Sequence, residues 1–146
     1  MMRVSKRTRY GLRALSALAA AYGEGPLSLR GIAAEQYLPV KYLERLFVAL
    51  KAAGLVRAVR GAGGGYVLVR PPHEIRLLDV FEVLEGPPDP VECLQPTAVC
   101  PHEAACVTRD VWYEVSQAVS QVLADHTLAD LVSQQHPCEE RGTYRT

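Results

Sequence analysis

The feature that most constrains the fold is a change of sequence period at residue 55. Two short β-prone runs, at 55–59 and 66–69, lie on either side of the glycine-rich segment RGAGGG at 60–65, which predicts a β-hairpin with a glycine-rich tip. Before residue 55, apolar residues recur at three- and four-residue steps in three segments, the spacing of helices with one buried face. Three helices followed by a two-stranded hairpin is the element order of a winged helix-turn-helix domain.

The first predicted helix runs over 5–22. Ser28 is well placed to cap the second helix, and the third begins near Pro39 and ends at Gly54, because proline favours the first helical position and glycine the position after the last turn. The expected fold class is therefore mostly α with a small β-hairpin wing.

After the hairpin, helical spacing returns at 77–84 and in a long segment at 108–124, and a short last helix begins near Thr127. The segment 86–105 has no period and is rich in proline, so it is expected to be a loop. We expect a winged helix-turn-helix domain at 1–71, a second functional region at 72–135 and a flexible tail at 136–146.

The charges are divided between the two halves of the chain. The formal net charge is zero, but residues 1–70 carry 12 basic and 3 acidic side chains, a net of +9, and the rest carries a net of −9. A strongly basic domain is suited to a polyanion such as DNA. No apolar run reaches the roughly 18 residues that a membrane span requires, and we expect a cytoplasmic protein with no membrane partner.

Candidate DNA contacts lie on the elements that would approach a duplex. The exposed start of a recognition helix reads base edges, and arginine beside a glycine-rich tip suits a narrow minor groove. The alternatives are a solvated polar face and a merely flexible hairpin tip. The predicted contacts are Lys6, Arg7, Ser28, Lys41, Tyr42, Glu44, Arg45, Arg60, Gly61, Gly63 and Gly64.

Catalysis has no candidate residues in this sequence. The glycine-rich tip lacks the lysine and serine or threonine of a phosphate-binding loop and the spacing of a dinucleotide fingerprint. No nucleophile, base and acid are arranged as in a known catalytic constellation. We therefore expect a protein that is not an enzyme.

Three cysteines, Cys93, Cys100 and Cys106, lie in the proline-rich loop. Thiolates are soft ligands suited to iron or zinc, and three of them leave one coordination position open. His102 is a candidate fourth ligand in the same loop. The alternatives are structural zinc and three unrelated small apolar residues. Cys138 lies in the predicted tail and is expected to be incidental.

The segment YLERLFVALKAAGLVRAVRGAGGGYVL at 42–68, with SKRTRYGLRAL at 5–15, resembles the Rrf2 family of bacterial winged-helix repressors and activators. The resemblance extends to about residue 135. It implies a homodimer that binds a palindromic operator in double-stranded DNA, with recognition helices in major grooves and the wing in the minor groove. It also implies that the helix at 108–124 forms the main dimer contact, so that 72–135 is a sensor and dimerisation region.

The resemblance implies an iron-sulfur cluster on the loop cysteines, because cluster-bearing members, of the IscR and NsrR types, carry three cysteines there. The first gap between cysteines is one residue longer here than expected. The fourth ligand does not carry over, because the matching positions are Arg109 for the IscR type and Arg9 for the NsrR type. Besides His102, the candidates are Glu103, Asp110 and a residue of the partner chain. A 2Fe-2S cluster is favoured over 4Fe-4S.

The expected function is transcriptional regulation in response to redox state, nitric oxide or iron-sulfur status. One alternative is a regulator without a cluster, which responds to thiol oxidation or to a partner protein as the CymR type does. Another is a regulator that binds zinc. A small iron-sulfur electron carrier is the alternative from a different class, and it would leave the basic half of the chain without a role.

Overall fold

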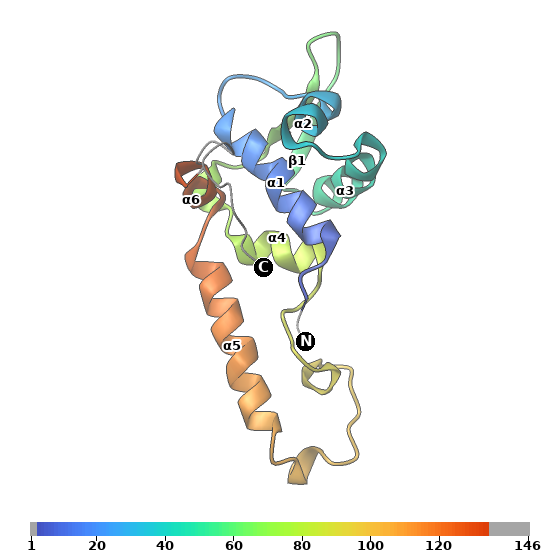
Figure 1. The fold of residues 1–146 in the computed structure, drawn as a ribbon, viewed down its shortest axis with the longest axis vertical. Helices are drawn as coiled ribbons and strands as arrows, with labels where there is room; N and C mark the ends of the chain where they lie inside the picture. The colour runs from blue at the N-terminus through green and yellow to red at the C-terminus, as the bar shows by residue number, and fades with distance from the viewer. Residues whose placement is uncertain (1–2, 135–146) are drawn as a thin grey trace, which may run out of the picture.

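The computed structural model describes residues 3–134. These residues form six α-helices, one hairpin and three short 3₁₀ helices (Figure 1), and the predicted class, mostly α with a small β-hairpin, is confirmed. The elements are, in chain order, α1 (Lys6–Ala20), α2 (Leu29–Gln36), α3 (Val40–Ala52), β1 (Val56–Val59), β2 (Gly65–Leu68), η1 (Pro72–Glu74), α4 (Leu77–Leu84), η2 (Glu92–Leu94), η3 (Glu103–Ala105), α5 (Arg109–Asp125) and α6 (Leu128–Ser133).

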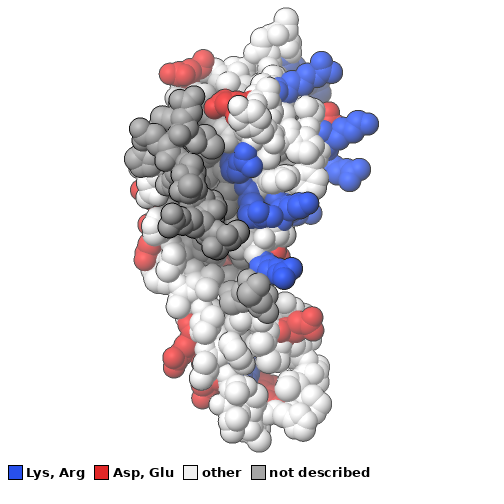
Figure 2. Space-filling view, viewed as in Figure 1, with Lys and Arg blue, Asp and Glu red and all other residues white. Residues whose placement is uncertain are grey.

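The elements divide into a packed part and an extended part. In Figure 1, α1 to α4, α6 and the hairpin lie together, and α5 and the loop that precedes it extend away from them. Lys and Arg side chains gather along one edge of the packed part, whereas the charged side chains visible on the extended part are mostly Asp and Glu (Figure 2). The charge asymmetry of the sequence is therefore also an asymmetry in space. Within residues 3–134, no helix is long and apolar enough to cross a membrane.

Local sequence signals explain where the first helices begin and end. Ser28 caps α2, because its Oγ accepts a hydrogen bond of 3.0 Å from the backbone N of Gly31. Pro39 directly precedes α3, and Gly54, at φ +75°, follows its last turn. Tyr22, the last residue of the first predicted helix, lies beyond the end of α1 and is exposed.

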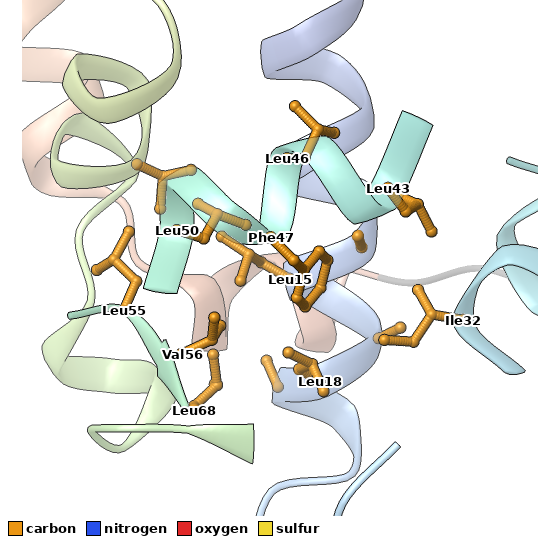
Figure 3. Packing of buried hydrophobic residues seen from close by; sticks show 14 of the residues in the cluster. Leu15, Leu18, Ile32, Leu43, Leu46, Phe47, Leu50, Leu55, Val56 and Leu68 are labelled. Carbon is orange, nitrogen blue, oxygen red and sulfur yellow. The ribbon is translucent and has the colours of Figure 1, made fainter. Parts of the chain in front are cut away.

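The hydrophobic core lies between α1, α3 and the hairpin (Figure 3). Residues of α3 at helical spacing, including Leu43, Phe47 and Leu50, are fully buried, as is Leu15 of α1. The ring of Phe47 meets Tyr66 of β2 edge to face, with the centroids 4.8 Å apart. Helix α3 therefore packs directly against the wing.

The helices that follow the hairpin pack into the same core. Leu128 of α6 and Ile75, which follows η1, are fully buried, and the backbone N of Leu128 donates to the carbonyl of Ile75 at 3.0 Å. Helix α1 contacts both α4 and α6. The division into a DNA-binding domain at 1–71 and a sensor and dimerisation region at 72–135 stays a prediction. The predicted tail at 136–146 lies outside the described residues.

Candidate nucleic-acid interface and cysteine loop

Helix α3 presents a polar face on the side opposite the core. Lys41, Glu44 and Arg45 are exposed at three- and four-residue steps, so their side chains lie along one face. Tyr42 is half-buried, and its ring meets that of Tyr10 in α1 edge to face at 5.5 Å. The side chains of Lys41, Glu44 and Arg45 are therefore available to a partner, whereas Tyr42 packs against α1.

The N-terminus of α1 carries exposed Lys6 and Arg7 and is held by α4. The carboxylate of Glu85, just after α4, accepts hydrogen bonds from the backbone N of Ser5 at 3.3 Å, from Ser5 Oγ at 2.6 Å and from the fully buried Thr8 hydroxyl. Partial desolvation raises the pKa of Glu85, but these hydrogen bonds and the charge of Arg7 outweigh it, and the net pKa is lowered. Glu85 thus fixes the start of α1 next to two basic side chains.

The turn between α2 and α3 is held from α1. The Arg13 guanidinium donates through Nη2 to the carbonyl of Gln36 and lies 6.0 Å from the centroid of the Tyr10 ring. Sequence reasoning missed these contacts and Glu85, because partners 23 and 80 residues apart leave no periodic signal. Ser28, a predicted DNA contact, is exposed but already uses its Oγ as the cap of α2.

The wing is a tight hairpin whose second strand also pairs with the chain before α2. Strand β1 pairs antiparallel with β2, with Val56 opposite Leu68 and Val59 opposite Gly65. Two backbone hydrogen bonds, of 2.8 and 3.0 Å, join Leu27 and Tyr66. The tip end of β2 therefore has a third short pairing, directly before residues 60–64 turn the hairpin.

The tip exposes Arg60, Gly61 and Gly63, and Gly64 is half-buried. The backbone N of Gly64 donates to the carbonyl of Gly61 at 3.0 Å, and a Cβ at Gly64 would collide with the carbonyl of Val59. The turn itself thus requires glycine at 64, whereas a Cβ at Gly63 would meet open space. The predicted DNA contacts Arg60, Gly61 and Gly63 remain accessible.

The loop between α4 and α5 contains the three cysteines but does not gather them into one ligand set. Cys93 lies in η2, Cys106 follows η3, and these two and Cys100 are all half-buried free thiols. His102 precedes η3 and is exposed. Among residues 3–134, no three His, Cys, Asp or Glu side chains are grouped so that they could hold a metal ion. The predicted ligands share one loop but are not brought together.

Cys106 has polar surroundings at the start of α5. Its Sγ lies 3.5 Å from Thr108 Oγ1. Hydrogen bonds from Thr108 and, more weakly, a backbone hydrogen bond from Arg109 and its positive charge lower the pKa of the thiol. Arg109 Nη1 lies 2.9 Å from the Glu103 carboxylate. Arg109, at the position expected for a fourth ligand, therefore forms an ion pair with Glu103, which is one of the candidate ligands.

A family profile described as "Rrf2: Iron-dependent Transcriptional regulator" matches residues 4–134. The chain belongs to the Rrf2 family. It is 43% identical over 132 residues to the HTH-type transcriptional regulator CymR of Bacillus subtilis, covering 90% of this chain and 91% of CymR. The resemblance stated from sequence is confirmed, and the Rrf2 family supports a DNA-binding winged helix and a role in transcription regulation.

Two solved structures of Rrf2 regulators superimpose on this one. That of CymR, the global cysteine regulator of B. subtilis, gives a TM-score of 0.80 at 43% identity, covering 93% of this chain and all of the other. That of IscR from T. potens gives a TM-score of 0.74 at 38% identity, covering 94% of this chain and 95% of the other. Relatives named CymR and relatives named IscR are thus both similar to this chain, and the fold does not separate them.

Proposed function

We propose that this Rrf2 protein is a homodimeric cytoplasmic regulator that reads a palindromic operator with α3 and the wing. The observation that carries the proposal is the basic edge of the packed part (Figure 2), together with the exposed Lys6 and Arg7 of α1, Lys41 and Arg45 of α3, and Arg60 of the wing. Arginine and lysine bind phosphates and guanine edges, which supplies both affinity and base preference. An electron carrier would give this edge no role.

The second copy would dock on α5. This helix buries only Ser116 fully and exposes apolar side chains, among them Val111, Trp112 and Val122. Ala118, Val119, Val122 and Leu123 line a shallow hollow of about 290 Å³. An apolar stripe on a helix that leaves the core is typical of an interface between identical chains, and a two-fold axis between paired α5 helices would match a palindromic operator.

The signal would be received by the cysteine loop, because the base of this loop is tied to both functional elements. Glu85 bonds the start of α1, and Asp89 accepts a hydrogen bond of 2.7 Å from the buried Ser116 of α5. Between them lie Gly86 and two prolines, which limit the freedom of the segment. A rearrangement of the loop can therefore act on the DNA-facing end of α1 and on the proposed dimer helix together.

The chemistry of the signal has two candidates. Three thiols are suitable donors for the predicted iron-sulfur cluster, but no three His, Cys, Asp or Glu side chains among residues 3–134 are grouped so that they could hold a metal ion. The absence of a grouped ligand set among residues 3–134 favours the second candidate, a regulator that responds through its thiols without a cluster. The polar surroundings of Cys106 support that reading.

DNA binding is tested by mobility shifts at fixed salt, with a duplex that the protein enriches from a random pool. Arg45→Ala and Arg60→Ala should each weaken binding roughly tenfold. Arg70→Ala is the matched control, because Arg70 lies beyond the wing and its Nη1 is 3.5 Å from the carbonyl of Glu74. Unchanged affinity in both test variants would reject the proposed docking face.

The signal chemistry is tested by absorption spectra and metal analysis of protein purified without oxygen. Visible absorption with stoichiometric iron and sulfide would establish the cluster, and a colourless protein with bound zinc would establish the zinc alternative. A colourless, metal-free protein whose DNA affinity changes reversibly on thiol oxidation would establish the cluster-free regulator.

A further inference from the structure

The exposed face of α3 carries one residue that does not fit a solvated surface. Lys41, Glu44, Arg45 and Lys51 are charged and exposed, whereas Val48 lies in the middle of the same face and is 69% exposed. Val48 comes one turn after Glu44 and Arg45 and one turn before Lys51, so charged side chains flank it on both sides. It is the only large apolar side chain of α3 that is exposed.

The packing of the fold does not require valine at position 48. The buried face of α3 is complete without it, since Leu43, Leu46, Phe47 and Leu50 fill the core. A β-branched residue also has a lower helix propensity than alanine or lysine. The Val48 side chain is therefore free to contact a partner of α3.

The charges around Val48 indicate what that contact is. A protein partner for an apolar side chain would have to cover Arg45 and Lys51 as well, whereas a DNA major groove accepts basic side chains along its phosphates. The one apolar feature on the base edges of that groove is the C5 methyl group of thymine. A valine amid polar residues on a recognition helix has the size and the position to pack against it.

We propose that Val48 is a specificity-determining residue that packs against the C5 methyl group of a thymine in each half-site. This inference rests on the proposed function, because it requires α3 to enter the major groove. It adds a preference for a T·A pair about one helical turn along α3 from the bases that Glu44 and Arg45 face.

The test removes the methyl group from the DNA and the side chain from the protein. A duplex is selected with the wild-type protein from a random pool, and each thymine is then replaced by uracil, which pairs identically but lacks the methyl group. One thymine in each half-site, related by the symmetry of the operator, should respond. Replacing it by uracil should weaken wild-type binding about fourfold per half-site, as expected for the loss of one buried methyl group. Val48→Ala should bind the thymine duplex with the same loss and show no further loss with uracil.

Two further variants make the result specific. Val48→Thr keeps the shape and one methyl group, and it should retain part of the thymine preference. Val69→Ala, at an exposed valine after β2, should bind like the wild type and discriminate uracil from thymine as the wild type does. Val48→Ala should fold normally, because it removes an exposed side chain and raises helix propensity, and thermal melting checks this.

Failure of this inference is distinguishable from failure of the proposed function. If no duplex is enriched, the protein does not bind DNA as proposed and both fail. If a duplex is enriched but no thymine methyl group matters, or if uracil weakens the wild type and Val48→Ala equally, only the role of Val48 is overturned. A change in oligomeric state of Val48→Ala by sedimentation would also overturn it, because the residue would then contact protein.

Discussion

Replacing Glu85 by alanine should loosen the start of α1 and lower the stability of the whole fold. One carboxylate accepts three hydrogen bonds, two from Ser5 and one from the fully buried Thr8, and its loss leaves the Thr8 hydroxyl without this acceptor. A hydrogen bond to a charged group contributes about 1.5–3 kcal/mol when it is shielded. Because Glu85 is solvent-exposed, screening reduces the total to about 1–2 kcal/mol.

Urea denaturation of both proteins at pH 7 and at about pH 3.5 measures this loss. The pKa of Glu85 is lowered in the folded state, so its contribution to the free energy of unfolding is complete above the ordinary glutamate pKa of about 4.3. It declines as the pH falls through the folded value, and the difference between the two proteins should shrink in acid. Glu82→Ala, an exposed change in the last turn of α4, is the control. A loss below about 0.3 kcal/mol, or one independent of pH, would refute the reasoning.

Three further changes test other parts of the structure. Leu128→Ala should lower the free energy of unfolding in urea by about 2–5 kcal/mol, because Leu128 is fully buried where α6 joins the core; a loss under 1 kcal/mol would contradict this packing. Gly65→Ala should lower the melting temperature and weaken DNA binding, since a Cβ there collides with the Leu27 carbonyl, while Gly63→Ala, in open space, should leave the melting temperature unchanged. Val122→Glu on the exposed face of α5 should give a folded monomer by sedimentation, and a stable dimer would rule out α5 as the interface.

The elements of the fold could be predicted because their signals are local. A serine directly before a helical segment favours an N-cap, as at Ser28. Leu43, Phe47 and Leu50 repeat with the period of a buried helical face. The predicted long helix at 108–124 is found at Arg109–Asp125, one residue away at each end. Each of these predictions needed only residues that are close together in the chain.

The parts that could not be predicted depend on contacts between distant residues. Glu85 is an ordinary acidic residue in the sequence, and only folding brings it to Ser5, 80 residues away. The grouping of Cys93, Cys100 and Cys106 in the sequence predicted a shared ligand set, but sequence distance in a loop without a period does not fix where each thiol lies. The exposure of Val48 became visible only once the buried face of α3 was defined.

The attachment of α5 has a mechanical consequence. The end of this helix is joined to the packed part through the backbone N of Leu77, which donates to the carbonyl of His126 at 2.8 Å, and through the pairing of Arg76 with Thr127. Its 17 residues make it about 25 Å long. A rotation of about 10° at this junction would displace the far end of α5 by about 4 Å, close to the rise of one base pair along DNA. A small angular change near His126 is thus amplified along α5 into a displacement of a few ångströms at the other end of the helix.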